Sequence, residues 1–115
     1  MSDSPSFLVH WKSRVLLPGK VMLDGLISQV KLGGFELKID RAVSIGTEIA
    51  LEFYVKYRDK PKRIRLKGKV TYCGIASSGE SMLRLSISQI GREDNHTLSN
   101  ILQTLGDSDA FDLRA

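Results

Sequence analysis

Two neighbouring stretches of the sequence alternate apolar and polar residues, and this pattern constrains the fold more than any other feature. Apolar residues occupy every second position from 49 to 57, and again from 64 to 72 with Gly68 in the series. A period of two is typical of strands that bury one face. The sequence therefore predicts a long hairpin with its turn at Asp59-Lys60-Pro61. The alternation places Tyr57 and Tyr72 on the inward side and Cys73 on the outward side.

Shorter alternating segments on either side predict further strands. Val15, Leu16 and Leu17 begin one, and Asp24-Gly25 is typical of a tight hairpin turn, after which residues 26–31 return. Gly33-Gly34 breaks that strand, and residues 35–39 form the next one. Residues 82–90 complete the strand set, with three apolar side chains on one face: Leu83, Leu85 and Ile87.

The period changes after Gly91. Apolar residues then recur at helical spacing, with Asp94 as the expected N-cap and Gly106 as the expected C-terminal glycine: Leu98, Ile101, Leu102 and Leu105. The predicted fold is mainly β, a small six-stranded antiparallel β-barrel with one C-terminal α-helix. We expect a single domain over residues 7–106, with flexible termini at 1–6 and 107–115.

Composition excludes several classes of protein. A chain of 115 residues fits one domain, and its apolar runs are far shorter than the ~20 residues that cross a bilayer. We expect no secretory signal, and a single cysteine is consistent with a reducing cytoplasm. Two histidines, a single cysteine and no nucleophile elbow, P-loop or HExxH motif give no support for catalysis or a metal site, so we do not expect an enzyme.

The positive charge is concentrated in one segment. Residues 56–69 carry eight basic residues and one acid, or +7, whereas the rest carries nine basic and twelve acidic residues, or −3. Four of the basic residues share the outward side of one predicted strand, and we call them the basic ladder: Arg63, Arg65, Lys67 and Lys69. The first interpretation is a solvated face, the second a docking surface for a protein partner, and the third a nucleic-acid surface.

From residue 10 to residue 105, the order and spacing of these elements resemble a PilZ domain, a split-barrel module that commonly receives cyclic di-GMP in bacteria. Two short family motifs align with this sequence. His10-Trp11-Lys12-Ser13-Arg14 matches RxxxR, and residues 29–34, Gln-Val-Lys-Leu-Gly-Gly, match (D/N)xSxxG. Arg14 and Gly34 keep the motif residue, whereas the sequence departs from it at three positions: His10, Gln29 and Lys31.

The departures fall on residues that the resemblance assigns to the ligand. In the family, arginines bind phosphates and guanine edges, and an imidazole at position 10 lacks the guanidinium donors and loses such a bond, at about 1.5–3 kcal/mol. Gln29 keeps an amide on a longer side chain, and Lys31 could either crowd the base or recover a phosphate contact. Trp11, beside Lys12, could stack on a guanine, although packing on the barrel is the favoured interpretation.

The resemblance therefore implies a stand-alone PilZ-like signalling adaptor in a bacterial cytoplasm. We expect it to act by binding another protein, with cyclic di-GMP binding weak or lost and no required cofactor. The candidate ligand site is expected around Arg14 and Gly34, away from the basic ladder. One alternative is a functional cyclic di-GMP receptor with a non-standard motif, and another is a small basic β-barrel that binds nucleic acid. A monomer or weak homodimer is expected.

Overall fold

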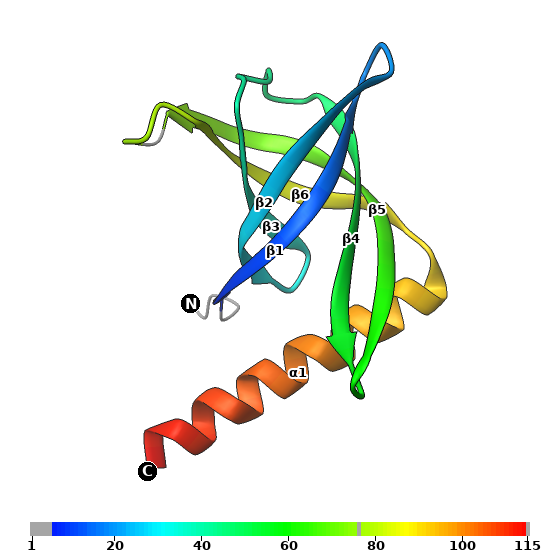
Figure 1. Ribbon diagram of the computed structural model, residues 1–115, viewed down its shortest axis with the longest axis vertical. Coiled ribbons are helices and arrows are strands. Elements are labelled where there is room, and N and C mark those ends of the chain that lie inside the picture. Colours follow the sequence, from blue (N-terminus) through cyan, green and yellow to red (C-terminus); the bar gives the residue numbers. More distant parts are fainter. Residues whose placement is uncertain (1–5, 76, 115) are drawn as a thin grey trace.

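Six antiparallel strands close into one barrel in the computed structural model, which describes the backbone of residues 6–75 and 77–114 and the side chains of residues 6–75 and 77–105. The strands are β1 (Ser6–Leu17), β2 (Val21–Lys31), β3 (Gly34–Ile39), β4 (Glu48–Tyr57), β5 (Lys60–Ile75) and β6 (Ser81–Ile90). Around the barrel they follow the order β1-β2-β3-β6-β5-β4, and β4 pairs with β1 to close the ring (Figure 1). The predicted six-stranded barrel is confirmed.

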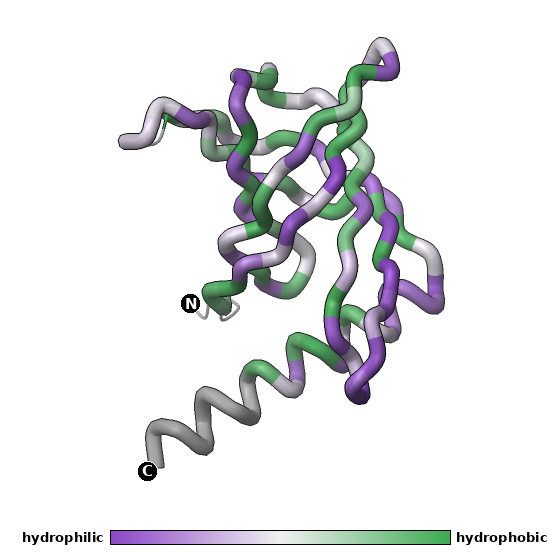
Figure 2. The backbone as a smooth tube through the Cα atoms, in the orientation of Figure 1, coloured by the Kyte–Doolittle hydropathy of each residue, from purple (hydrophilic) through white to green (hydrophobic). Residues whose placement is uncertain are grey.

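The barrel core consists of the inward residues of the alternating segments. Ile49, Leu51, Phe53 and Val55 of β4 are all buried, and they face the buried Ile64 and Leu66 of β5 across the hairpin. Figure 2 shows the resulting alternation of hydrophobic and hydrophilic residues along the strands. Burial of these side chains is the main force that holds the ring together, because each fully buried aliphatic or aromatic residue contributes about 1.5–3 kcal/mol.

Helix α1 (Arg92–Arg114) follows β6 and packs its first turns against the end of the β4–β5 hairpin (Figure 1). Leu98 and Ile101 are buried, and Leu102 and Leu105 pack against the core, so the predicted apolar stripe is confirmed. The amide of Asn100 also donates a hydrogen bond of 3.0 Å to the hydroxyl of Tyr57. These contacts fix the helix across one end of the barrel.

Both predicted helix ends are wrong. Gly91 precedes the helix, and its carbonyl accepts a hydrogen bond from Asn95 N at 2.9 Å, so Gly91 is the N-cap. Asp94 lies in the first turn instead, where its carboxylate accepts a hydrogen bond from Arg65 N at 3.2 Å. The backbone stays helical through Gly106 to Arg114, because a glycine weakens a helix by only about 1 kcal/mol and no proline follows.

The terminal segments and the N-terminal strand differ in extent from their predictions. Ser6 begins β1, whereas the rest of the expected N-terminal tail lies outside the described residues, as does Ala115 at the other end. The polar residues 10–14 are part of β1 rather than a segment before the first strand. The single-domain assignment over residues 7–106 stays a prediction.

The predicted hairpin turn at Asp24-Gly25 is wrong. β2 runs straight through both residues, and Pro18, Gly19 and Lys20 form the turn between β1 and β2. Gly25 serves close packing instead, since a Cβ atom there would lie 2.9 Å from Val15 Cγ2 and 3.0 Å from Leu37 Cδ1. The glycine at position 25 is therefore explained by close packing inside the barrel and not by a turn of the chain.

A bulge in β5 reverses the expected sides of two residues. The pairing of β5 with β6 shifts register between Val70 and Tyr72, which leaves Thr71 as an extra residue. Tyr72 therefore points outward and is 43% exposed, and Cys73 packs against the core, the opposite of the prediction for both. At the other end of the hairpin, the turn residues are Arg58 and Asp59, one position earlier than expected.

None of the helical segments in the described part of the chain is both long and apolar enough to span a membrane. Within the same residues, no cluster of three or more His, Cys, Asp or Glu side chains is arranged to hold a metal ion.

Candidate functional site

A polar hollow of about 560 Å³ lies beside the turn between β2 and β3, and we call it the β2–β3 hollow. It brings together three of the predicted ligand residues: Gln29, Lys31 and Gly34. Further polar lining comes from Glu36, Thr71, Arg84 and Ser86. Its volume is in the range of small-molecule sites, although its wall is more polar than is usual for them.

Two glycines shape this hollow. Gly33 has a φ of 83°, which favours glycine at the turn, and its carbonyl accepts a hydrogen bond from Ile87 N at 2.9 Å. A Cβ atom on Gly34 would lie 2.9 Å from the carbonyl oxygen of Leu85 and 3.4 Å from Lys31 Cε. Gly34 therefore lets β3 approach β6 closely, and the Lys31 stem lies against its backbone.

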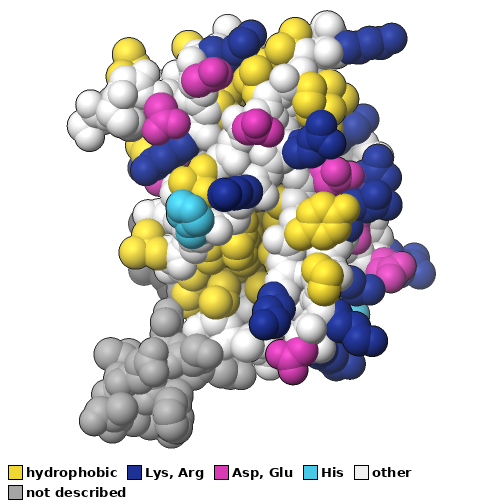
Figure 3. Space-filling model, in the orientation of Figure 1, with side chains coloured by type: hydrophobic (Ala, Val, Ile, Leu, Met, Phe, Trp, Pro, Cys, Tyr) yellow, Lys and Arg dark blue, Asp and Glu magenta, His cyan; other side chains and the backbone are white. Residues whose placement is uncertain are grey.

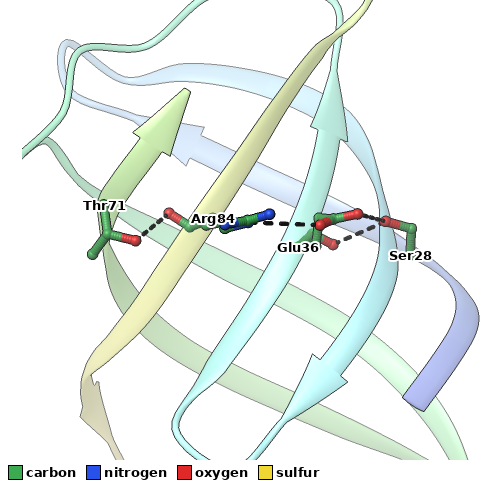
Figure 4. A network of polar contacts seen from close by, with 4 residues as sticks. All are labelled: Ser28, Glu36, Thr71 and Arg84. Carbon is green, nitrogen blue, oxygen red and sulfur yellow. Dashed lines mark hydrogen bonds and ion pairs between the residues drawn. The ribbon is translucent and has the colours of Figure 1, made fainter. Parts of the chain in front are cut away.

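A row of polar contacts crosses β2, β3, β6 and β5 next to the hollow (Figure 4). The hydroxyl of Ser28 donates to Glu36 Oε1 at 3.3 Å, and Glu36 Oε2 lies 3.9 Å from Arg84 Nε. Thr71 completes the row by donating its hydroxyl to the Arg84 carbonyl at 3.2 Å. Glu36 thus holds Arg84 only loosely, and the guanidinium keeps donors for a second anion.

Arg84 is a candidate ligand residue that the sequence did not reveal. Its guanidinium carbon lies 5.0 Å from the centre of the Tyr72 ring, a cation–π contact that orients it over the sheet. This contact exists only because the bulge at Thr71 turns Tyr72 outward. The one available signal was that Arg84 is the charged residue of this strand and lies at an outward position.

The N-terminal motif residues do not join this hollow. His10 and Lys12 line another hollow, together with Lys38 and Asp40, and Arg14 lines a third. They are dispersed because residues 10–14 lie in an extended strand, where four residues span about 13 Å at ~3.3 Å per residue. His10 and Arg14 are therefore separated along the strand and line different hollows.

Trp11 points to the inner side of β1 and contacts the core. Its ring stacks on Phe53 with centroids 5.5 Å apart and planes 12° from parallel. The other residues around it belong to the end of the barrel and to the helix, and include Tyr57, Ile101 and Leu105. The position of Trp11 therefore agrees with a packing role, which is the interpretation favoured from the sequence.

The basic ladder lies on the outer face of β5, as predicted, and Figure 3 shows Lys and Arg side chains gathered along the side of the molecule that carries β4 and β5. Glu52 of β4 interrupts the positive charge, since its Oε2 lies 3.3 Å from Arg65 Nε and 3.9 Å from an Arg63 terminal nitrogen. Closure of the barrel places Arg14 of β1 opposite Glu52 of β4 in the strand register. Arg14 therefore lines one hollow together with Arg65 and Lys67. The expected separation of Arg14 from the ladder is therefore wrong.

No protein-family model matches the chain, and no curated protein matches it in sequence. Its structural neighbours are more informative. The structure of the Bacillus subtilis inhibitor of motility, MotI/DgrA, superposes with a TM-score of 0.76 at 13% identity, covering 96% of this chain and 52% of that one. The chain thus spans about half the length of MotI/DgrA.

The second neighbour is the PilZ domain with c-di-GMP of YcgR from Escherichia coli. It gives a TM-score of 0.69 at 11% identity, covering 98% of this chain and 97% of that domain. Identities this low establish the fold and nothing finer. The chain has a PilZ-like fold, which confirms the fold predicted from the spacing of its elements.

Proposed function

We propose that this chain is a signalling adaptor of the cyclic di-GMP receptor type that acts by binding another protein, with its own affinity for cyclic di-GMP weak or lost. The fold supports the class, since YcgR is a PilZ domain with c-di-GMP and MotI/DgrA is an inhibitor of motility. The dispersal of the motif residues over separate hollows carries the proposal.

The separation of the motif residues lowers the expected affinity for a di-anionic ligand in two ways. Arg14 lies on the β4–β5 side of β1, while Gln29, Lys31 and Gly34 lie beside the β2–β3 turn, so the two motif sets line different hollows. The Trp11 ring already stacks on Phe53, which makes one of its faces unavailable for a guanine. Each missing charge-assisted hydrogen bond costs about 1.5–3 kcal/mol, or roughly tenfold or more in affinity.

Isothermal titration calorimetry of the chain with cyclic di-GMP tests this proposal. We expect no saturable heat at micromolar ligand and no change in Trp11 fluorescence, because the indole stays on Phe53. Low-micromolar binding that Arg14→Ala abolishes would overturn the proposed loss of affinity.

A second candidate function is a cyclic di-GMP receptor with a non-standard site. One observation favours it, namely that the β2–β3 hollow holds the cations Lys31 and Arg84 beside the amide of Gln29. This candidate predicts that Lys31→Ala and Arg84→Ala each weaken binding about tenfold, while Arg14→Ala leaves it unchanged. Calorimetry on the three variants, with Lys38→Ala as a charge control outside the hollow, separates the two candidates.

We further propose that the domain is not an enzyme and that it works in the bacterial cytoplasm. Its PilZ-like fold supports both proposals, and the sequence, which has none of the nucleophile, P-loop or metalloprotease motifs, supports the first. The outer face of β1, β4 and β5 provides evidence on the chemistry of the protein partner.

A further inference from the structure

An apolar row crosses the outer face of the barrel beside the basic ladder. Cross-strand pairing aligns Met22 with Leu16, Leu16 with Ala50, and Ala50 with Lys67. Met22 is 52% exposed and Leu16 is 38% exposed, so two aliphatic side chains face solvent next to each other. Since neighbouring strands lie ~4.8 Å apart, the three apolar residues form a stripe about 10 Å wide that ends at a lysine.

A charged row lies next to the apolar row on the same face. It runs across the paired strands as Asp24, Arg14, Glu52 and Arg65. Glu52 forms its ion pairs with Arg63 and Arg65. Among the described residues, Arg14 and Lys67 take part in no ion pair, so two cations beside the apolar stripe are available to a partner.

From these two rows we infer that the hollow formed by Arg14, Leu16, Met22, Ala50, Arg65 and Lys67 docks an acidic segment of a protein partner that also carries aliphatic side chains. The aliphatic side chains cover the stripe, and the carboxylates meet Arg14 and Lys67. This inference rests on the proposed adaptor function and specifies the chemistry of its partner. Opposite charges at the rim and an apolar centre are the usual arrangement of a protein interface.

The lining favours a protein over a nucleic acid. Nucleic-acid grooves combine cations with aromatic side chains on which bases stack, whereas the floor of this hollow is aliphatic. The exposed aromatic residue of the β4 outer face, Tyr54, does not line the hollow.

Selection of random twelve-residue peptides on the immobilised full chain tests the inference. We expect the enriched sequences to combine two or more acidic residues with a pair of aliphatic residues. In an NMR titration, the tightest of these peptides should shift the amide signals of Leu16, Met22, Ala50 and Lys67. Enrichment no greater than in the unselected library, or enrichment without acidic residues, would overturn it.

Charge reversal on neighbouring ladder residues provides a matched pair of variants. Lys67→Glu should weaken the selected peptide about tenfold, because an attraction becomes a repulsion, whereas Lys69→Glu should change binding less than twofold. Lys69 lies on the same side of the same strand but does not line the hollow. Met22→Ser should weaken binding about fivefold through loss of apolar contact.

Three further outcomes would contradict the inference. The first is equal weakening by both lysine variants, and the second is peptide-induced shifts confined to the β2–β3 hollow. The third is binding of a single-stranded oligonucleotide that Lys67→Glu abolishes, which would assign the face to nucleic acid. The cyclic di-GMP titration is independent of these measurements. A result that overturns the proposed loss of affinity can therefore be distinguished from one that overturns this docking surface.

Discussion

At the scale of single residues, Trp11 links the N-terminal strand to the middle of the core. Its ring stacks on Phe53, and Phe53 in turn meets the edge of Phe35, with centroids 5.7 Å apart and planes at 72°. Aromatic pairs in these geometries contribute about 0.5–1.5 kcal/mol beyond the area that they bury. The energetic role of Trp11 in packing is thus sufficient to explain its presence without a ligand.

Gly25 provides the prediction at this scale. Gly25→Ala should lower the free energy of unfolding by about 1–3 kcal/mol, because the new Cβ atom would crowd Val15 and Leu37 in a closed barrel. Urea denaturation followed by Trp11 fluorescence measures the change. Gly91→Ser is the control, since nothing lies within 4 Å of a Cβ there and serine is a good N-cap. Equal stability of Gly25→Ala and the parent chain would contradict the prediction and show that the neighbouring side chains adjust to the added methyl group.

At the scale of elements, the β4–β5 hairpin combines a strongly specified pair of strands with a poorly suited turn. Ten residue pairs hold β4 and β5 in register without a bulge. The turn residues Arg58 and Asp59 nevertheless have φ values of 53° and 62°, the combination that a type I′ turn requires and that Asn-Gly adopts at lower cost. The buried strands therefore determine the turn, and not the reverse.

Replacing these two residues should stabilise the hairpin. The double variant Arg58→Asn with Asp59→Gly is expected to raise the free energy of unfolding by about 1 kcal/mol, because Asn and Gly adopt the left-handed backbone conformation with less strain. The gain exceeds the loss of the exposed cation–π contact of Arg58 with Tyr57, which is worth about 0.5 kcal/mol. Thermal unfolding by circular dichroism checks this, and a lower midpoint than the parent would refute it.

At the scale of the whole molecule, the barrel arranges its surface into distinct regions. The basic ladder and the apolar row share the face of β1, β4 and β5, while the β2–β3 hollow lies across β2, β3 and β6. The charged segment 56–69 is therefore divided, because the basic ladder lies on this face whereas Lys62 pairs with Glu93 of α1. A partner and a nucleotide would meet different parts of the surface.

The packing of α1 predicts the oligomeric state. Leu98 and Ile101 are buried against the barrel, so the helical stripe that could have paired two chains is already covered within one. Light scattering coupled to size exclusion should give the monomer mass of 12.8 kDa at tens of micromolar. A dimer mass that persists on dilution to one micromolar would contradict this expectation.

The sequence predicted those features that depend on neighbouring residues. Alternation at 49–57 fixed which side of β4 is buried, and the spacing from Leu98 to Leu105 identified the helix and its apolar stripe. Of the predicted site residues, the sequence correctly grouped Gln29, Lys31 and Gly34 in one place, because a strand and its turn keep these residues close, while their role toward a ligand stays a prediction.

The remaining features depend on contacts between distant parts of the chain. Whether Asp24-Gly25 turns or continues was decided by side chains from β1 and β3. A single extra residue, Thr71, exchanged the sides of Tyr72 and Cys73, since the period of a strand is two.

The sequence by itself therefore determined the elements and their buried faces, because hydrophobic periodicity is local. Only the tertiary structure decided that Arg14 lies beside Arg65 and Lys67, because closure of the ring by β1 and β4 joins segments that are far apart along the chain. The pairing of β1 with β2 likewise keeps this strand extended, so that His10 and Arg14 line different hollows.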